Sequence, residues 1–589
     1  MSRFVNRKSI LSVLVALILV VAFAGGVFLR GSVTQAAHAS SGKTTKSVFC
    51  SKLGKTIQAS SGAQNYCFGA QPNGSANVRH SLTHSFGPNV DAANPGEDVT
   101  PSGVQAYGQS EVSVAASGHY AVEAWNDATG FFSSCGAPQN KEELTGLGFS
   151  ANSGASYTDL GGLTNAGCNN NVYDGDPAVE SWTTGGKTYF YVASLFNCNS
   201  AAGCTSDPRS HLAMDTCVAS GKASSATLTC SQPALVASSS ECATFPGPPP
   251  FTFCSFLDKE FMSIDRVHGL LYTSYTEFGF TPDLSASTDI IELAVCDIGN
   301  GALGGTPAAP VCTNGGSGSA LAPAAPYLVV ANTDPAGCEN EGAYPAVDPA
   351  SGDVYVAYEH NWASALFGCF PGPQSPVQNV MNYIPAGCLT LPTASCGPAA
   401  TNAVNITSLQ AAFVPGYNRF PMNDFPRIAV SDAKSTVSMV WNDARFHIGG
   451  DILMQSMNLV TLGNTSGAPV VLNTDRGGWH FLPALRNVNL SGKLNVSWFS
   501  RASANTAITD VTAALDVNAR STATPSNTLV TTVPSDWNAV SSDIVPNFGD
   551  YTDNYTINTA SNTPGSRDFV AWSDGRLGIP QPFSSVAFT

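Results

Sequence analysis

Charged side chains are scarce in this 589-residue chain. They make up 12% of it, and 26 basic against 42 acidic residues leave a net charge of −16. A protein that grips a nucleic-acid backbone needs a concentration of Lys and Arg, so a nucleic-acid partner is not expected.

Several catalytic signatures are also absent. The chain has no H-E-x-x-H zinc helix, no P-loop, no G-x-G-x-x-G after a strand and no G-x-S-x-G nucleophile elbow. Helical periodicity is missing after the first 39 residues, which excludes an α-helical or α/β domain.

The N-terminus looks like an export signal. Arg3, Arg7 and Lys8 precede an apolar run over residues 10–28, and Ala37-His38-Ala39 fits an A-x-A cleavage site. The run approaches the ~20 residues that span a bilayer, so residues 1–39 are either a cleaved signal or an uncleaved membrane anchor. In both cases the protein is expected to be secreted or extracellular.

Sixteen cysteines follow this signal, which indicates an oxidising compartment and disulfides. Sequence neighbours are the natural partners, although sequence alone leaves the connectivity open. The pairs are Cys50 with Cys67, Cys135 with Cys168, Cys198 with Cys204, Cys217 with Cys230, Cys242 with Cys254, Cys296 with Cys312, Cys338 with Cys369, and Cys388 with Cys396.

One two-strand unit recurs seven times along the chain: an apolar strand, a polar turn, and an aromatic-rich strand that ends in an acid or Asn. The spacing from Pro426 to Trp441 equals that from Pro483 to Trp498. The units are residues 111–127, 176–196, 260–278, 341–360, 424–445, 480–501 and 550–576.

Two further strand-like stretches between hairpins make four strands per unit, which predicts an all-β fold, a β-propeller of four-stranded blades over residues 101–589. Seven blades are favoured over six. Residues 40–100 form a polar lead, and a strand from it, around residues 77–84, should complete the last blade and leave no exposed edge.

Residues 150–157, SANSGASY, resemble the Asp-box S-x-D-x-G-x-[ST]-W, with Asn for Asp and Tyr for Trp. With the hairpins, this motif resembles the sialidase-like Asp-box (BNR repeat) propeller family. The resemblance implies glycan chemistry, with an arginine triad, a Tyr nucleophile with a nearby Glu, and an Asp acid/base. The family's enzymes have six blades and an F/Y-R-I-P arginine motif, whereas this chain has the scrambled order Phe425-Pro426-Arg427-Ile428.

Acidic side chains stand where the blades start, and these positions share one rim of a propeller. They either converge on a polar ligand or divalent cation, or cap their own turns. The catalytic pool is Asp176, Glu260, Glu341, Asp424 and Asp550; Asp258, Glu339 and His480 are also blade-start residues, and His480 alone receives no role.

Three arginines, Arg445, Arg501 and Arg576, lie on adjacent blades and either bind a ligand carboxylate or orient their own loops by pairing with an Asp two residues earlier. Tyr344 and Tyr551 complete the ligand-binding candidates.

Two functions follow from these features. The first is a secreted propeller that acts on or binds extracellular glycans, and as a hydrolase of sialidase type it would use two rim carboxylates. The alternative is a non-catalytic extracellular disk that recognises a protein or cell-wall polymer. No cofactor is required, Ca²⁺ is a candidate cation, and a monomer is expected, with membrane contact only through an uncleaved N-terminal segment.

Overall fold

The computed structural model describes most of the chain after residue 85. The described ranges are residues 86–96, 107–129, 144–163, 173–196, 209–222, 225–231, 233–240, 242–245, 251–280, 287–313, 327–332, 339–362, 375–396, 402–409, 411, 414–417, 425–431, 435–465, 467–488, 492–503, 506–544, 546–557 and 566–588. The proposed signal, the 77–84 stretch and Asp424 lie outside them. No helix in these ranges is long and apolar enough to cross a membrane.

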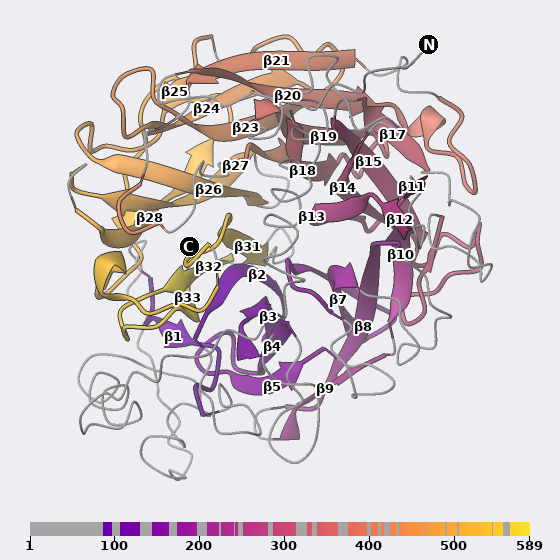
Figure 1. Ribbon diagram of the computed structural model, residues 1–589, viewed down its shortest axis with the longest axis horizontal. Coiled ribbons are helices and arrows are strands. Elements are labelled where there is room, and N and C mark those ends of the chain that lie inside the picture. Colours follow the sequence, from indigo (N-terminus) through magenta and orange to yellow (C-terminus); the bar gives the residue numbers. More distant parts are fainter. Residues whose placement is uncertain are drawn as a thin grey trace, which may run out of the picture.

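Seven antiparallel sheets surround one axis, as Figure 1 shows, so the seven-bladed β-propeller is confirmed and the six-bladed alternative is wrong. Each innermost strand contacts the innermost strands of both neighbouring blades, and the last contacts the first. In blade order these strands are β2 (Gln109–Ser117), β6 (Ala178–Thr184), β13 (Phe256–Asp265), β18 (Glu339–Val347), β22 (Arg427–Ser431), β26 (Trp479–Val488) and β31 (Asp553–Ile557).

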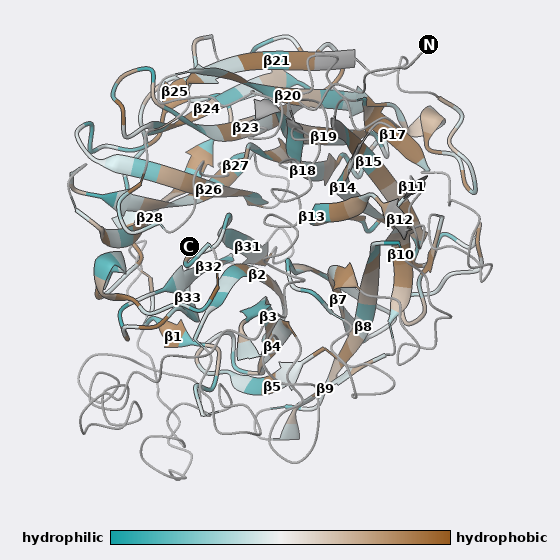
Figure 2. Ribbon diagram, in the orientation of Figure 1, coloured by the Kyte–Doolittle hydropathy of each residue, from teal (hydrophilic) through white to brown (hydrophobic). Residues whose placement is uncertain are grey.

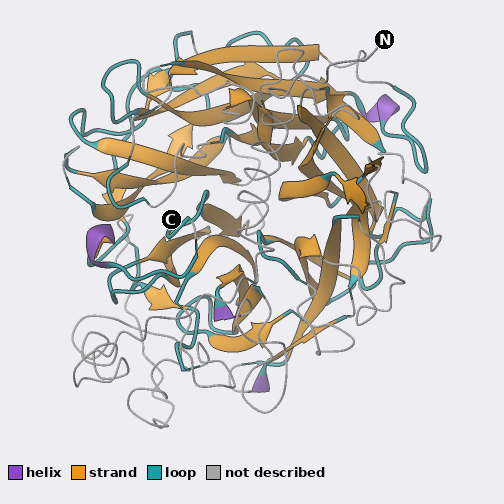
Figure 3. Ribbon diagram, in the orientation of Figure 1, coloured by secondary structure: helices purple, strands orange, loops and turns teal. Residues whose placement is uncertain are grey.

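The other strands follow outward in chain order and dominate Figure 3. Blade 1 contains β3 (Tyr120–Asp127), β4 (Thr145–Ser150) and β5 (Thr158–Gly162). Blade 2 contains β7 (Lys187–Phe196), β8 (His211–Ser220), β9 (Thr227–Cys230) and β10 (Ala234–Ser238). Blade 3 contains β14 (Leu270–Phe280), β15 (Ser287–Asp297), β16 (Val311–Cys312) and β17 (Leu328–Ala331). A separate hairpin, β11 (Cys242–Phe245) and β12 (Phe251–Cys254), lies between blades 2 and 3 in the chain.

Blades 4 to 7 repeat the arrangement. The outer strands of blade 4 are β19 (Val354–Trp362), β20 (Pro376–Ile384) and β21 (Asn402–Leu409), and those of blade 5 are β23 (Thr436–Asp443), β24 (Asp451–Asn458) and β25 (Val470–Val471). Blade 6 contains β27 (Lys493–Arg501), β28 (Ile508–Asn518), β29 (Thr528–Leu529) and β30 (Ser535–Asp536). Blade 7 contains β32 (Arg567–Asp574) and β33 (Gln581–Phe588). Short 3-10 helices, η3 (Ala386–Cys388) and η7 (Trp537–Ala539), interrupt the loops.

An N-terminal strand occupies the outer edge of blade 7. In β1 (Val90–Asp91), Val90 pairs with Ser584 and Asp91 with Phe583 of β33. The Ala92 amide also donates to the Pro582 carbonyl (2.8 Å). The seventh blade therefore contains both ends of the described chain.

The aromatic residue of the second strand has a repeated role. Trp125, Trp441 and Trp572 are fully buried, and each indole Nε1 donates to the Asp two residues later, at 3.4, 3.0 and 2.6 Å. The same Asp accepts a backbone amide of the following turn. In these three blades, the Asp that ends the second strand thus joins the core to the rim.

The hydrophobic core lies between neighbouring blades. One cluster joins Ala429 and Val440 of blade 5 to Leu485 and Trp498 of blade 6, and in Figure 2 the hydrophobic colour concentrates on the strands. Burial of these faces between adjacent sheets is the main favourable contribution to folding.

Four of the predicted disulfides are present: Cys217–Cys230, Cys242–Cys254, Cys296–Cys312 and Cys388–Cys396. The first three join residues that are directly opposite in paired strands. The other four predicted pairs lie outside the described ranges.

The turn over residues 150–157 connects the third and fourth strands of blade 1, β4 and β5. Asn152 Oδ1 accepts from the Ser150 hydroxyl and the Ser156 amide (both 2.9 Å), and the Gly154 amide donates to Ser150 Oγ (2.9 Å). Asn152 therefore organises the turn through its side-chain oxygen, and Tyr157 is buried beneath it.

Candidate functional site at the propeller axis

Bulges in the innermost strands determine which side chains turn toward the axis. The pairing register shifts between Ser110 and Ser113 in β2 and between Asp258 and Phe261 in β13. Glu111 and Lys259, within these bulges, have positive φ (56° and 53°), and Asp176, two residues before β6, has φ 54°. Such conformations cost on the order of 1–3 kcal/mol in non-glycine residues and concentrate at functional sites.

These strained positions bring one amine among four carboxylates, here called the axial cluster: Glu111, Asp176, Asp258, Lys259 and Asp550. Lys259 Nζ lies 2.5 Å from Asp176, 3.3 Å from Asp550, 3.5 Å from Glu111 and 3.7 Å from Asp258. The lysine side chain is only 5% exposed. Four blades, namely 1, 2, 3 and 7, therefore meet in one buried ion network.

Asn126, at the end of β3, bridges two acids of the axial cluster. Its Nδ2 donates to Glu111 Oε2 (2.8 Å) and Asp176 Oδ1 (3.0 Å), while its Oδ1 accepts the Asp176 amide (2.5 Å). The two carboxylate oxygens can be no farther apart than the sum of the first two distances. A Cβ on Gly175 would lie 2.6 Å from Asn126 Oδ1, so this approach needs glycine.

The two bridged acids hold their protons differently. Burial, and then the charge of Asp176, raises the pKa of Glu111 well above its usual value. Burial alone would raise the pKa of Asp176, but Lys259 and hydrogen bonds from Glu111 and Asp258 lower it overall. Glu111 therefore holds its proton more tightly than Asp176 does.

Asp550 and Tyr551 connect the axial cluster to blade 7. Asp550 Oδ1 accepts from the Tyr417 hydroxyl (2.5 Å), and the Asp550 amide donates to Glu111 Oε1 (3.0 Å). The Tyr551 ring lies 5.9 Å from Lys259 Nζ. Next to Lys259, Glu260 is buried, and burial raises its pKa well above the ordinary value.

A second group of polar and aromatic residues contacts the cluster through Tyr551. The Arg427 guanidinium lies over the rings of Phe261, Tyr344 and Tyr551, at 4.0, 4.8 and 5.8 Å from their centroids. Burial lowers the pKa of Arg427. Arg486, from β26, is 2.8 Å from Glu180. These side chains come from blades 2 to 7.

The remaining acid candidates are separate from the Lys259 contacts. Glu341 is buried and lies opposite Glu359 in blade 4. Asp424 lies outside the described residues. The structure therefore brings together Asp176, Asp550 and Tyr551, with Glu260 beside them and Tyr344 one contact farther away.

The three candidate arginines each contact different residues. Arg445 pairs with Asp443 (2.5 Å) and Arg576 with Asp574 (2.6 Å), in both cases the Asp two residues earlier. Arg501 has Phe499 at that place and instead donates to Thr509 and to the Pro415 carbonyl. The contacts of Arg445 and Arg576 therefore favour the interpretation that each arginine orients its own loop.

Sequence reasoning missed Glu111 and Lys259 as site residues. Glu111 begins the first repeat unit, in the position where acids of later units are candidates, so the pattern contained a signal for it. Lys259 is one of few basic residues and stands between Asp258 and Glu260. Only the bulge in β13 shows that its side chain turns inward.

No known protein family and no curated protein match the chain. Among solved structures it is similar to an unknown-function protein from Dyadobacter fermentans, at 13% identity over 70% of this chain and 93% of that one, with a TM-score of 0.37. The Hadza microbial sialidase matches at 11% identity over 69% and 64% (TM-score 0.34). The α-L-arabinanase of Penicillium chrysogenum matches at 10% over 86% and 98% (TM-score 0.33).

Proposed function

We propose that this protein is a secreted glycan-active propeller that hydrolyses glycosides at its axis, with Glu111 as proton donor and Asp176 as the second carboxylate. The single observation that carries the proposal is the unequal setting of two acids that share the Asn126 amide: Lys259 lies 2.5 Å from Asp176 but 3.5 Å from Glu111. Burial raises the pKa of Glu111, whereas Lys259 lowers that of Asp176. Environments that separate the pKa values of neighbouring carboxyls are the pattern by which one group acts as acid and the other as base or nucleophile.

The separation of the two acids bears on stereochemistry. Because both oxygens are hydrogen-bonded to the same Asn126 nitrogen, they are closer than the roughly 6.5–9.5 Å found in inverting glycosidases. Retaining enzymes use the shorter spacing of about 5–5.5 Å. The direct hydrogen bond between Glu111 and Asp176 holds the two acids closer than either spacing, so a substrate has to separate them before they act, and ¹H NMR of the first-formed anomer would report the stereochemistry.

A specific observation favours the alternative, a non-catalytic glycan- or protein-binding disk. The carboxylates of Glu111, Asp176 and Asp550 are at most 10% exposed and all contact Lys259. A network that serves only to hold blades together would have the same contacts. The two functions therefore differ in whether changing Glu111 or Asp176 affects turnover, binding or only stability.

The test is hydrolysis of fluorogenic glycosides, including a sialoside and an α-L-arabinofuranoside, with and without Ca²⁺. Glu111→Gln and Asp176→Asn should each lower kcat/KM by roughly 10²–10⁴-fold, as loss of an acid or base does. Glu123→Gln is the matched control, because Glu123 is also a buried acid with a raised pKa but contacts Ser584 and Tyr157 instead.

Absence of turnover on every glycoside, with retained binding on a glycan array by the wild type and both variants, would establish the disk instead. If the hydrolytic activity required Ca²⁺, the site would include a bound cation. The four disulfides agree with an oxidising, extracellular location, where glycans are available as substrates.

A further inference from the structure

Two imidazoles and one carboxylate meet at the seam between blades 5 and 6, away from the axial cluster. One ligand atom from each of His447, Asp451 and His480 lies within 4.8 Å of the other two. His447 is in the loop between β23 and β24, Asp451 begins β24, and His480 is the second residue of β26. We propose that these three residues bind a divalent transition metal such as Zn²⁺.

The three side chains are oriented as ligands. His480 Nδ1 lies 3.3 Å from the Gly450 carbonyl, an acceptor, so this nitrogen carries the proton and Nε2 retains its lone pair. Asp451 Oδ1 accepts from Asn473 Nδ2 (2.7 Å), and Asn473 is itself held by the Ile452 amide (2.9 Å). Metal-binding His and carboxylate groups typically have such outer partners.

The second Asp451 oxygen provides an independent indication. Asp451 is completely buried, and its Oδ2 has no hydrogen-bond partner within the described ranges. His447 Nε2 contacts the other oxygen at 3.1 Å. A buried carboxylate oxygen without a partner is costly, and a bound cation would satisfy it.

The loop backbone is shaped for this close approach. A Cβ on Gly449 would lie 2.0 Å from Trp479 Cδ1, and one on Gly450 would lie 2.3 Å from Asn442 Nδ2. Glycine at both positions therefore lets the His447 loop of blade 5 reach the start of blade 6. Two atoms bound at ~2.1 Å from one metal are at most ~4.2 Å apart. The partly exposed His447 side chain has only to move inward slightly.

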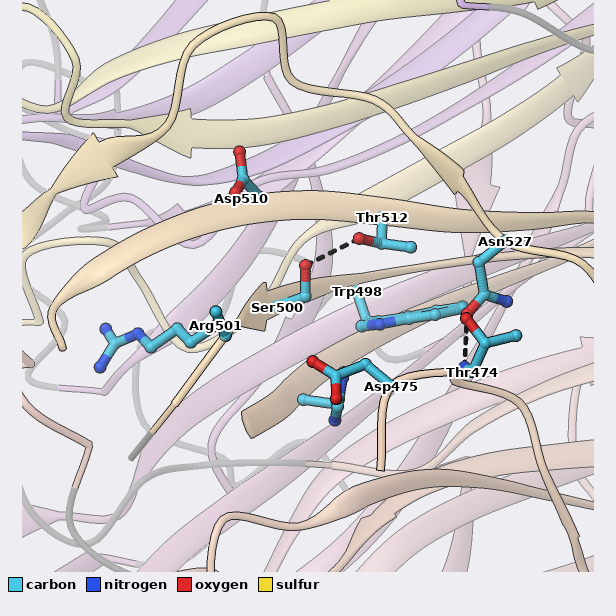
Figure 4. Close-up of a pocket in the computed structure, with 10 residues that line it drawn as sticks. Thr474, Asp475, Trp498, Ser500, Arg501, Asp510, Thr512 and Asn527 are labelled. Atoms are coloured by element: carbon cyan, nitrogen blue, oxygen red, sulfur yellow. Dashed lines mark hydrogen bonds between the residues drawn. The ribbon is translucent and has the colours of Figure 1, made fainter. Parts of the chain in front are cut away.

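The donor set selects the kind of metal. Two imidazole nitrogens and one carboxylate suit Zn²⁺ and other first-row transition metals, whereas Ca²⁺ prefers oxygen ligands alone. His480 also lines a pocket of about 220 Å³, shown in Figure 4 with Asp475, Trp498, Ser500, Arg501 and Asp510. Of the three proposed ligands, only His480 lines this pocket.

The test uses purified full-length protein, stripped with EDTA and titrated with Zn²⁺ alone in a calorimeter. The wild type should bind one equivalent, and Co²⁺ substitution should give a visible absorption band. His447→Ala should weaken Zn²⁺ binding by at least tenfold, because it removes one of three ligands. Asp451→Asn, which keeps the shape of the side chain, should do the same.

His268→Ala is the matched control. His268 is also a partly exposed histidine beside a carboxylate, 2.6 Å from Asp265, but it belongs to no three-ligand group among the described residues. Zn²⁺ affinity unchanged by His268→Ala and lost in the His447 and Asp451 variants supports the site. No stoichiometric binding by the wild type, or equal affinity in His447→Ala, would overturn it. Neither result depends on the proposed glycosidase activity.

Discussion

At the scale of single residues, Lys259 is the cation on which the axial cluster depends. Four carboxylates lie within 3.7 Å of its amine. Removing one partner of a buried ion network leaves uncompensated charge, which usually costs ~3–5 kcal/mol. The strained backbone at Glu111, Asp176 and Lys259 is tolerated because the surrounding blades hold it.

Lys259→Met should therefore lower the free energy of unfolding by ~3–5 kcal/mol at neutral pH, measured by urea denaturation. The loss should shrink at acidic pH, where the carboxylates take up protons. Lys493→Met is the control, since Lys493 pairs with Asp516 at 3.0 Å but its side chain is 49% exposed, and it should cost less than ~1 kcal/mol. Equal losses in the two variants would contradict the network.

Glu123 supplies a pH-dependent prediction. Burial raises its pKa to about 8, although Ser584 and Tyr157 offset part of the effect. The folded state then binds a proton that the unfolded chain releases near pH 4.5, so stability from this group falls as the pH rises toward 8. Between pH 4.5 and 8, the free energy of unfolding of Glu123→Gln should therefore rise by ~1.4 kcal/mol per pH unit relative to that of the wild type. Parallel stability curves for the two proteins would show that Glu123 is already ionised.

At the scale of elements, the bulges of the innermost strands determine how closely the blades pack. In β18 the register shifts between Glu341 and Tyr344, and Gly342 there has φ 72°. A Cβ on Gly342 would lie 2.0 Å from Phe425 Cγ of the next blade. The glycine is needed both for its backbone conformation and for the space between blades 4 and 5.

Gly342→Ala should destabilise the protein by at least ~2 kcal/mol more than Gly185→Ala, judged by chemical denaturation. Gly185 also has a positive φ of 57° but has no atom within 4 Å of the Cβ position. It therefore isolates the conformational cost of about 1–2 kcal/mol. If both variants lost the same stability, the contact with Phe425 would have no energetic role.

At the scale of the whole molecule, β1 pairs with β33 at the outer edge of blade 7, so both ends of the described chain lie in one blade. Asn89, just before β1, also accepts from Arg576 Nη2 (3.0 Å) and donates to the Val530 carbonyl (2.8 Å). The N-terminal segment thus holds blade 7 and contacts blade 6. Because both ends of the described chain share blade 7, the ring should unfold cooperatively.

Ala92→Pro should lower the free energy of unfolding by ~3 kcal/mol, because it removes the amide that donates to Pro582. Ala92→Gly retains this amide and should cost about 1 kcal/mol or less. Thermal unfolding of both variants compares them directly. A proline variant as stable as the glycine variant would mean that this hydrogen bond does not contribute to closure.

The sequence by itself determined the local features of this protein. The hairpins, the Asp two residues after Trp125, Trp441 and Trp572, and four of the disulfides involve residues that are close in the chain, so periodicity and spacing predict them. The number of blades follows by counting the same units. The turn at residues 150–157 is likewise a local pattern, carried by the Asn152 side chain.

Only the tertiary structure decided which residues share a site. Lys259 is 148 positions from Glu111 in the sequence, and Asp550 is 439 positions from it. The ring of blades and the bulges of β2 and β13 bring the three residues together. Their protonation depends on burial, which no local pattern encodes. His447 and His480 meet for the same reason, because they stand on facing edges of two blades that pack side by side.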